Sequence, residues 1–224
     1  MKPIVFNTQD VKSIQDGKKT QTRRLINPQP RSENSYYGGE VISSTNKSLI
    51  GCVGFCRSPL AVCDHDYRRP PYQTGDVLYV RETWTCIRNV FNAYEEDYFY
   101  AAIQFDYNTV STTCLCDDDG FETGKPFPWK SPLSMPKKLA RLFLLVTDVK
   151  AQRLQDITPR DAWDEGCRIG QYPWGQHLPE IRQMCVNNAF KLLWNTAHPK
   201  DGWNTNPWVW VIGFKQTEKP EVVE

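Results

Sequence analysis

"RLFLLVTDVKAQRL", residues Arg141–Leu154, is a long apolar segment of strand character, and we expect it to form a central strand of the fold. The segment that follows it, "TPRDAWDEG" (Thr158–Gly166), has the pattern of a short helix. Thr158 can cap this helix, a proline takes the first helical position, an acid follows in the first turn, and Gly166 can end it. The sequence therefore predicts a long strand that leads into a short capped helix.

Further elements are predicted on both sides of this segment from apolar alternation or helical spacing. Strands are expected at residues 4–6, 19–26, 74–84, 97–103 and 206–215, and helices at residues 9–15, with Thr8 as the cap, and 177–195. Residues 27–72 and 108–130 are expected to be loop-like. This balance predicts an α+β fold with a small curled sheet or barrel. The 224 residues suit one domain over 1–224 with insertions near 31–70 and 106–128.

The composition is that of an ordinary globular chain, with 40% hydrophobic and 24% charged residues. The formal net charge is only +1, so any electrostatic footprint for nucleic acid must be local. No apolar run approaches the roughly 18 residues of a membrane span, and the opening "MKPIVFNTQD" lacks the apolar core of a signal peptide. We therefore expect a cytoplasmic protein with no membrane partner, whose eight cysteines stay reduced.

"DGKKTQTRR", residues Asp16–Arg24, packs four cationic side chains between two apolar runs. Gly17 lets the backbone turn tightly before an extended segment. Side chains alternate along an extended segment, so Lys19, Gln21 and Arg23 are expected on one face and Thr20, Thr22 and Arg24 on the other. From these residues alone, a basic strand that faces water is favoured over a ligand site, because charge runs are usually solvated.

The short helix predicted at residues 158–166 carries acids at both ends. Asp161 and Glu165 share one helix face at i, i+4 spacing. Asp161 lies near the helix start, where the helix dipole favours a carboxylate, but Glu165 lies at the opposite end, where the dipole disfavours one. Glu165 therefore needs another reason for its place, such as a cationic partner, and Lys19 is a candidate.

Eight tryptophans make the chain unusually aromatic. Trp208 and Trp210 share one strand face and are expected in the core. Trp84 ends a predicted strand beside Arg81 and Glu82, so it can stack on a base, although packing in the core is slightly favoured.

The cysteines are the remaining candidates for chemistry. Cys52, Cys56 and Cys63 fall with His65 in one loop-like region, and "CLC" (Cys114–Cys116) lies in another. A zinc site usually has two paired knuckles, and no clean second pair follows Cys52 and Cys56, so free thiols are favoured over zinc. Glycine-rich phosphate loops and the H-E-x-x-H and G-x-S-x-G motifs are absent.

Gly17, Lys19 and Arg24 fit the G-x-K-x-x-x-x-R signature, and the chain here resembles the ASCH domains of the PUA-like superfamily. The segments "GDVLYVRETW", "VTDVKAQRLQDITPRDAWDEG" and "NPWVWVIGFK" look like the same family. The resemblance is particularly close to the larger ASCH proteins of bacterial prophages and phages. It covers both ends and the middle of the chain, and it is poorest over residues 31–70 and 106–128.

The resemblance implies a PUA-like β-barrel with flanking helices around a cleft that binds RNA or a modified nucleoside, without a cofactor or metal. A small bacterial ASCH enzyme hydrolyses N4-acetylcytidine with a Lys, a Thr and a Glu, which match Lys19, Thr22 and Glu165 here. The match of Glu165 depends on aligning the segment "LQDITPRDAWDEG" with that enzyme by its Leu and Thr. Substrate-binding roles are assigned to six further residues, which are Gly17, Lys18, Arg24, Arg81, Glu82 and Trp84.

Two features of the residues bear on this amidohydrolase prediction. Lys19 and Thr22 lie on opposite faces of an extended segment, so the chain would have to bend after Gly17 to bring them together. A carboxylate beside Lys19 also favours the charged amine, which opposes its use as a base. The alternative prediction is a non-catalytic module that binds RNA or reads a modified base. A metal-dependent nuclease or zinc-stabilised module is the third.

Overall fold

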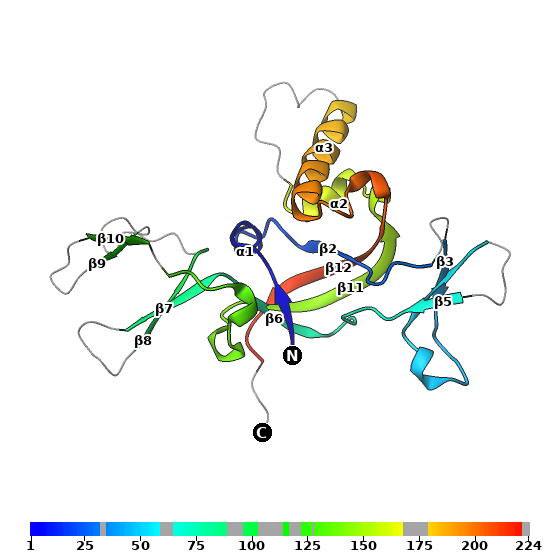
Figure 1. The fold of residues 1–224 in the computed structure, drawn as a ribbon. Coiled ribbons are helices and arrows are strands. Elements are labelled where there is room, and N and C mark those ends of the chain that lie inside the picture. Colours follow the sequence, from blue (N-terminus) through cyan, green and yellow to red (C-terminus); the bar gives the residue numbers. More distant parts are fainter. Residues whose placement is uncertain are drawn as a thin grey trace. The chain divides into compact units, whose positions relative to one another are not determined.

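The computed structural model describes residues 1–31, 35–58, 65–88, 96–102, 114–116, 122–126, 128–167 and 179–220. The chain divides into two compact units. Unit 1 comprises Met1–Gly17, Val77–Leu144 and Gln216–Glu224, and unit 2 comprises Lys18–Asp76 and Leu145–Lys215. Both units combine β-sheet with short helices, so the predicted α+β class is confirmed (Figure 1). The expected single domain stays a prediction.

In unit 1 the strands follow the order β1-β6-β11. Strands β1 (Lys2–Val5) and β6 (Val77–Arg81) pair in parallel, and β11 (Phe143–Arg153) begins in this unit. The predicted strand at 74–84 is shorter than expected, because Glu82 and Thr83 separate β6 from β7 (Trp84–Arg88). β7 pairs with β8 (Glu96–Tyr100), and β9 (Cys114–Cys116) pairs with β10 (Glu122–Pro126).

Helix α1 (Thr8–Gln15) follows β1, as the sequence predicts, and buries Val11 and Ile14. The predicted cap is wrong by one residue. Asn7 has extended backbone angles, and its side chain accepts a hydrogen bond of 2.8 Å from the backbone nitrogen of Asp10, so Asn7 is the cap and Thr8 is already helical. The helix is followed by Gly17, whose φ of 67° is in the left-handed region.

In unit 2 the order is β11-β12-β2. β11 pairs with β6 where it begins in unit 1 and with β12 in unit 2, so it has a strand on each side, which confirms the central position predicted for it. β12 (Trp208–Thr217) and β2 (Gln21–Leu25) are antiparallel, and the register places Val209 opposite Leu25. β2 is the edge strand of this sheet, and among the described residues the strands close no barrel. The predicted barrel therefore stays a prediction.

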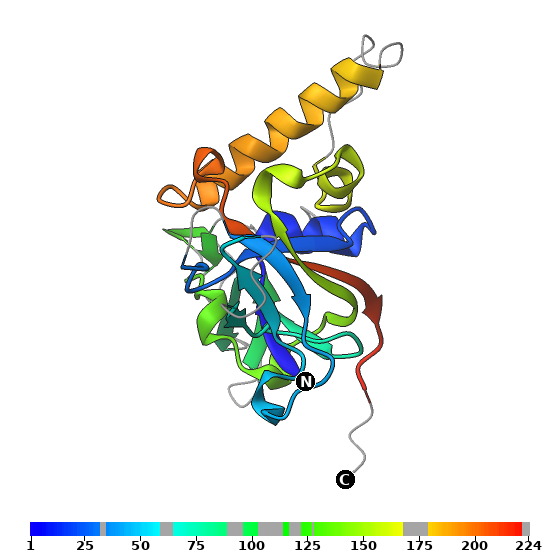
Figure 2. The ribbon, with the colours of Figure 1, turned by 90° about the vertical axis from the view of Figure 1, so that its right-hand side faces the viewer.

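Helices α2 (Pro159–Asp164) and α3 (Pro179–Ala197) lie on the same side of the β11-β12-β2 sheet (Figure 2). Both were predicted from the sequence, α3 with slightly different bounds. They enclose a core that also includes one face of β12, and its buried members are Leu154, Ile157, Ala162, Cys167, Phe190, Trp194, Val209 and Val211. Trp208 and Trp210 are buried, as predicted. Short 3-10 turns occur at Lys47–Leu49, Pro132–Ser134, Lys137–Leu139, Leu154–Asp156 and Trp203–Thr205.

The loop predicted over residues 27–72 is wrong in its central part. This region contains a three-stranded antiparallel sheet of β3 (Tyr36–Glu40), β4 (Val53–Cys56) and β5 (His65–Arg68). All four residues of β4 are buried. The glycines in "YYGGE" and "VGFC" weaken the alternation by which a strand is recognised in sequence, although they pair readily here. The loop predicted over 108–130 likewise contains β9 and β10.

Replacing Gly17 tests the turn that follows α1. The φ of 67° is unfavourable for other residues, and no atom lies within 4 Å of the position that a Cβ would take. We expect Gly17→Val to lower the free energy of unfolding by about 1–2 kcal/mol through backbone strain alone. Gly17→Asn is the control and should lose less, because asparagine tolerates this conformation. Urea denaturation that shows equal stability for wild type and Gly17→Val would contradict this expectation.

Candidate functional site

Helix α2 begins with the predicted capping arrangement. The hydroxyl of Thr158 accepts a hydrogen bond of 3.1 Å from the backbone nitrogen of Asp161. The Asp161 carboxylate in turn accepts one of 3.0 Å from the backbone nitrogen of Thr158 and one of 2.8 Å from its hydroxyl. Glu165 is the C-cap residue of the helix, and Gly166 follows with a φ of 88°. Because the cap fixes Asp161 at one end and the glycine ends the helix, both acids are held on one face.

Lys19 meets Glu165 at the C-terminal end of α2, although 146 positions separate them in the chain. The Lys19 Nζ donates hydrogen bonds to the Glu165 carbonyl oxygen at 2.8 Å and to its Oε2 at 3.0 Å. Each of these side chains is only 6% exposed. An isolated antiparallel bridge joins the two residues, and the backbone nitrogen of Thr20 donates to the Asp164 carbonyl at 2.8 Å. The cationic partner predicted for Glu165 is therefore present, and it is Lys19.

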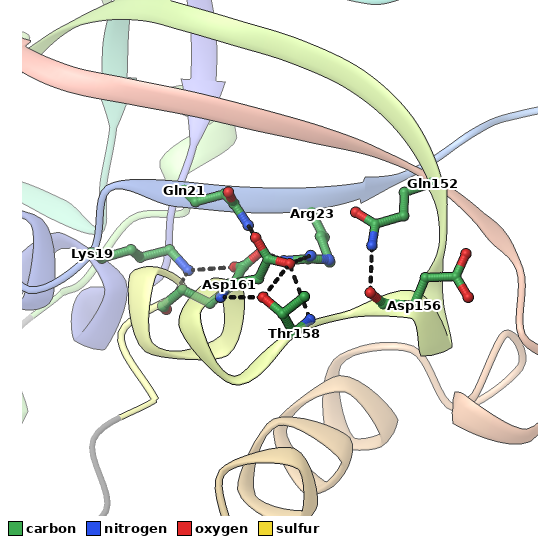
Figure 3. A network of polar contacts seen from close by, with 8 residues as sticks. Lys19, Gln21, Arg23, Gln152, Asp156, Thr158 and Asp161 are labelled. Carbon is green, nitrogen blue, oxygen red and sulfur yellow. Dashed lines mark hydrogen bonds and ion pairs between the residues drawn. The ribbon is translucent and has the colours of Figure 1, made fainter. Parts of the chain in front are cut away.

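Arg23 completes the network from β2, and its side chain is fully buried. Its Nη1 donates to Glu165 Oε1 at 3.0 Å, and its Nη2 lies 3.3 Å from Asp161 Oδ2. Gln21 Nε2 adds a hydrogen bond of 3.4 Å to Asp161 Oδ1. Figure 3 shows Lys19, Gln21 and Arg23 directed towards α2. We call the contacts among Lys19, Arg23, Gln21, Asp161 and Glu165 the β2–α2 network.

Arg23 was not among the residues selected from the sequence, which favoured Arg24. The signal was nevertheless available. Lys19, Gln21 and Arg23 share one face of an alternating segment, and Asp161 and Glu165 share one face of a helix. Matching the two faces would have identified Arg23.

Arg23 retains capacity to donate hydrogen bonds. No described residue accepts a hydrogen bond from its Nε. Its Nη2 is close enough to Asp161 for an ion pair, but the contact does not have the geometry of a hydrogen bond. The guanidinium is also 5.8 Å from the centre of the Phe190 ring, measured from Cζ. A buried guanidinium with two such nitrogens can bind a water or a polar ligand atom that reaches the network.

The environment of Asp161 favours its ionised form. Burial is the largest influence on the pKa of this carboxyl and raises it, but the hydrogen bonds from Thr158, the charge of Arg23 and the hydrogen bond from Gln21 together hold the pKa below the usual 3.8. Because the folded-state pKa is depressed, ionised Asp161 stabilises the fold above pH 3.8, and this contribution is lost as the pH falls through the lower folded value.

Thr22 and Arg24 lie on the other face of β2. Val209 and Val211, opposite Leu25 and Arg23, belong to the core beneath the helices, whereas Thr22 pairs with Ile212. Since side chains alternate along a strand, Thr22 is directed away from the β2–α2 network, and it is 5% exposed. The structure thus brings Lys19 and Glu165 together without Thr22.

Arg24 has a different environment from Arg23. It pairs with Trp210 in the sheet register and is half-buried. Burial lowers the pKa of His198, and the charge of Arg24 lowers it further, whereas the backbone of Trp194 and the charge of Asp201 oppose the shift. The His198 ring stacks on Trp194 with centroids 4.1 Å apart. Lys18 is exposed.

The substrate-binding residues predicted in unit 1 are engaged in packing and ion-pair contacts. Glu82 is 1% exposed, and its carboxylate is held by Arg141 through two hydrogen bonds of 2.9 and 2.8 Å. The Arg81 guanidinium donates to the Leu133 carbonyl at 3.3 Å.

Trp84 packs in the core of unit 1, which agrees with the interpretation that the sequence slightly favoured. The side chain is 7% exposed, and its neighbours in this core include Tyr79, Met135 and Phe143. The Lys130 Nζ lies 4.7 Å from the centre of the indole ring. A base could reach the ring only if these neighbours moved.

The described cysteines form no metal site. Cys52 and Cys56 are free thiols, and both they and Cys167 are buried. No group of three or more His, Cys, Asp or Glu side chains in the described part of the chain is placed to hold a metal ion. Cys63 lies outside the described residues, as do the side chains of His65, Cys114 and Cys116, so the zinc hypothesis stays a prediction.

Among the helices that the structure describes, none is both long and apolar enough to cross a membrane.

Comparisons with models of protein families, with curated proteins and with solved structures found no match for this chain. The resemblance to ASCH domains therefore rests on the sequence motifs alone and stays a prediction.

Glu165→Gln tests whether the fold of unit 2 depends on the β2–α2 network. The substitution removes the carboxylate that pairs with the buried cations Lys19 and Arg23. We expect the free energy of unfolding to fall by about 3–5 kcal/mol, because Lys19 and Arg23 lose the carboxylate that they share and Arg23 keeps only its contact with Asp161. Asp164→Asn in the same helix is the matched control. It removes the exposed i, i+4 pair with Arg160 and should change stability by only about 0.3–0.5 kcal/mol. Similar losses in both variants, measured by urea denaturation, would contradict this account.

Proposed function

We propose that this protein is an ASCH-type protein of PUA-like fold that binds a modified nucleoside, free or within RNA, and hydrolyses the amide of an N4-acylated cytidine. Lys19, Thr22 and Glu165 are the residues proposed for the reaction. A cytoplasmic location is part of the same proposal.

The observation that supports this proposal is the contact between Lys19 and Glu165. The alignment of two separate motifs requires these residues to meet, and their side chains are 3.0 Å apart across 146 positions of sequence. Apolar residues of similar size would pack at such a buried place without any penalty for removing charges from water. Paired charges at a buried position are accordingly a common feature of functional sites.

The proposed reaction assigns one step to each residue. The Thr22 hydroxyl attacks the carbonyl carbon of the acyl amide, and its proton passes by way of Lys19 to the exocyclic nitrogen of cytidine as the amide bond breaks. Water then hydrolyses the acyl ester on Thr22 to release the acid and restore the hydroxyl. Glu165 takes up the proton that Lys19 must lose before it can act as a base. Arg23 positions the Glu165 carboxylate through the hydrogen bond from its Nη1 to Oε1.

The position of Thr22 favours a second candidate function. Thr22 lies on the opposite face of β2 from the network, so catalysis requires a rearrangement of the segment around residues 19–22 when substrate binds. A protein that binds RNA or reads a modified base without hydrolysing it needs no such change. In that case Lys19 and Arg23 provide positive charge and hydrogen bonds only.

Incubation of the purified protein with N4-acetylcytidine distinguishes the two functions. We expect cytidine and acetate to form in equal amounts, as measured by chromatography, and Thr22→Val and Lys19→Ala to lower the rate by about 100-fold or more. Thr20 and Lys47 are exposed and have no role in the proposed reaction, so Thr20→Val and Lys47→Ala are the controls and should retain the activity.

Binding must be measured in the same samples. Binding of N4-acetylcytidine by calorimetry without any product would favour the non-catalytic reader. Full activity in a folded Lys19→Ala variant would contradict the role of the β2–α2 network, and the absence of both binding and turnover would contradict both functions.

A further inference from the structure

Unit 2 contains a second candidate site that shares no residue with the β2–α2 network. It is an open cavity of about 950 Å³, lined by parts of residues 29–37, by Arg153 and by parts of residues 201–208. A volume of this size is at the upper end of the range for small-ligand pockets, about 300–1,000 Å³. It therefore has room for more than a single nucleoside.

One wall of the cavity is a rigid arrangement around Trp208. The Cζ of Arg153 lies 4.7 Å from the centre of the Trp208 ring, and its Nη1 and Nη2 donate to the carbonyls of Asn206 at 3.0 Å and Ser35 at 3.3 Å. The indole nitrogen of Trp208 donates to Ser35 Oγ at 2.9 Å. These contacts hold a cation and an aromatic ring in fixed positions, so this wall is organised before any ligand binds.

The outer part of the cavity presents aromatic rings to solvent. Tyr36 and Tyr37 are consecutive residues of β3 and are 47% and 52% exposed. Tyr37 pairs in register with Phe55, whose ring packs edge-on against Trp208 with centroids 4.9 Å apart. Because side chains alternate along β3, Tyr37 shares the face of Phe55, and Tyr36 is directed to the other face. The exposed Tyr37 therefore stands on a strand that is anchored to the rigid wall, which suits it to stack on a flat ligand.

Positive charge accompanies these rings. The side chain of Arg31 is exposed beside the cavity. Arg31 also lines a small adjoining cavity together with Arg57. Asp66, which lines the small cavity, is already bound by Arg68 through its carboxylate oxygens, and Asp201 lines the large cavity together with Arg31 and Arg153. Cations are therefore in excess here, although the net charge of the whole chain is only +1.

We propose that this cavity binds single-stranded nucleic acid, with a base stacked on Tyr37 and a phosphate bound by Arg31. Exposed aromatic rings beside cations are the arrangement by which proteins bind single strands, because every base has a flat face and every linkage has a charge. An acidic peptide would use the cations but would gain little from an exposed ring. The proposal does not depend on hydrolysis at the β2–α2 network.

The test is fluorescence anisotropy with the full chain and labelled single strands of about ten nucleotides, which is within the usual site size. RNA and DNA of the same sequence are compared, each between about 50 and 200 mM salt. We expect Tyr37→Ala to weaken binding by about 5- to 150-fold. Arg31→Ala should weaken binding of all sequences. It should also reduce the slope of binding affinity against salt concentration by about the contribution of one phosphate contact.

Two control variants are available in the same part of unit 2. Tyr67 lies in the same three-stranded sheet and is 37% exposed, but it does not line the cavity, so Tyr67→Ala should bind like the wild type. Lys47→Ala removes an exposed cation away from the cavity and should also have little effect. Tighter binding of RNA than of DNA would assign the site to RNA, and equal binding would assign it to single strands in general.

Three results would overturn the proposal. They are absence of binding to both strands at low salt, equal loss in Tyr37→Ala and Tyr67→Ala, and displacement of the strands by poly-glutamate at equal charge concentration. The last result would assign the cavity to acidic peptides. None of these results affects the nucleoside assay, which measures product from the β2–α2 network, so failure of one proposal is distinguishable from failure of the other.

Discussion

The constraint on which unit 2 depends is that charges removed from water must be paired. Lys19 and Arg23 are 6% and 4% exposed, and both donate to the carboxylate of Glu165. These contacts attach the edge strand β2 and the residues before it to α2, while β12 pairs with the opposite edge of β2. Buried ion pairs add little net stability compared with apolar packing but are strongly destabilising when one partner is lost. The network thus fixes a particular arrangement of strand and helix, and this property suits a site that must hold reactive groups in place.

The sequence predicted the parts of the structure in which local rules and tertiary packing agree. β11 is long and apolar, α2 has a complete capping box, and the carboxylate of Glu165 opposes the helix dipole, so each could be placed without the structure. The partner of Glu165 was predicted because a misplaced charge needs a counter-charge. The strands β3 and β4 were missed because glycine interrupts their alternation, and pairing between strands distant in sequence is invisible in a local pattern.

The choice between Arg23 and Arg24 shows a different limit. Both are arginines of one strand, and a family motif selects Arg24. Which face of β2 meets the helix is decided by its register with β12, where Val211 lies opposite Arg23. Strand register depends on long-range pairing, so it could not be read from the segment itself. The same register directs Thr22 away from the network, and it makes the conformation of residues 19–22 the main structural question for catalysis.

Direct observation of the Lys19 amine provides the most direct test of whether the β2–α2 network is the ligand site. Lysine side chains labelled with ¹⁵N can be followed by NMR, and the Lys19 signal can be assigned by its loss in Lys19→Arg. The account predicts that added N4-acetylcytidine shifts the Lys19 signal, while the signal of the exposed Lys47 stays unchanged. An unchanged Lys19 signal at a concentration that saturates binding would contradict the account.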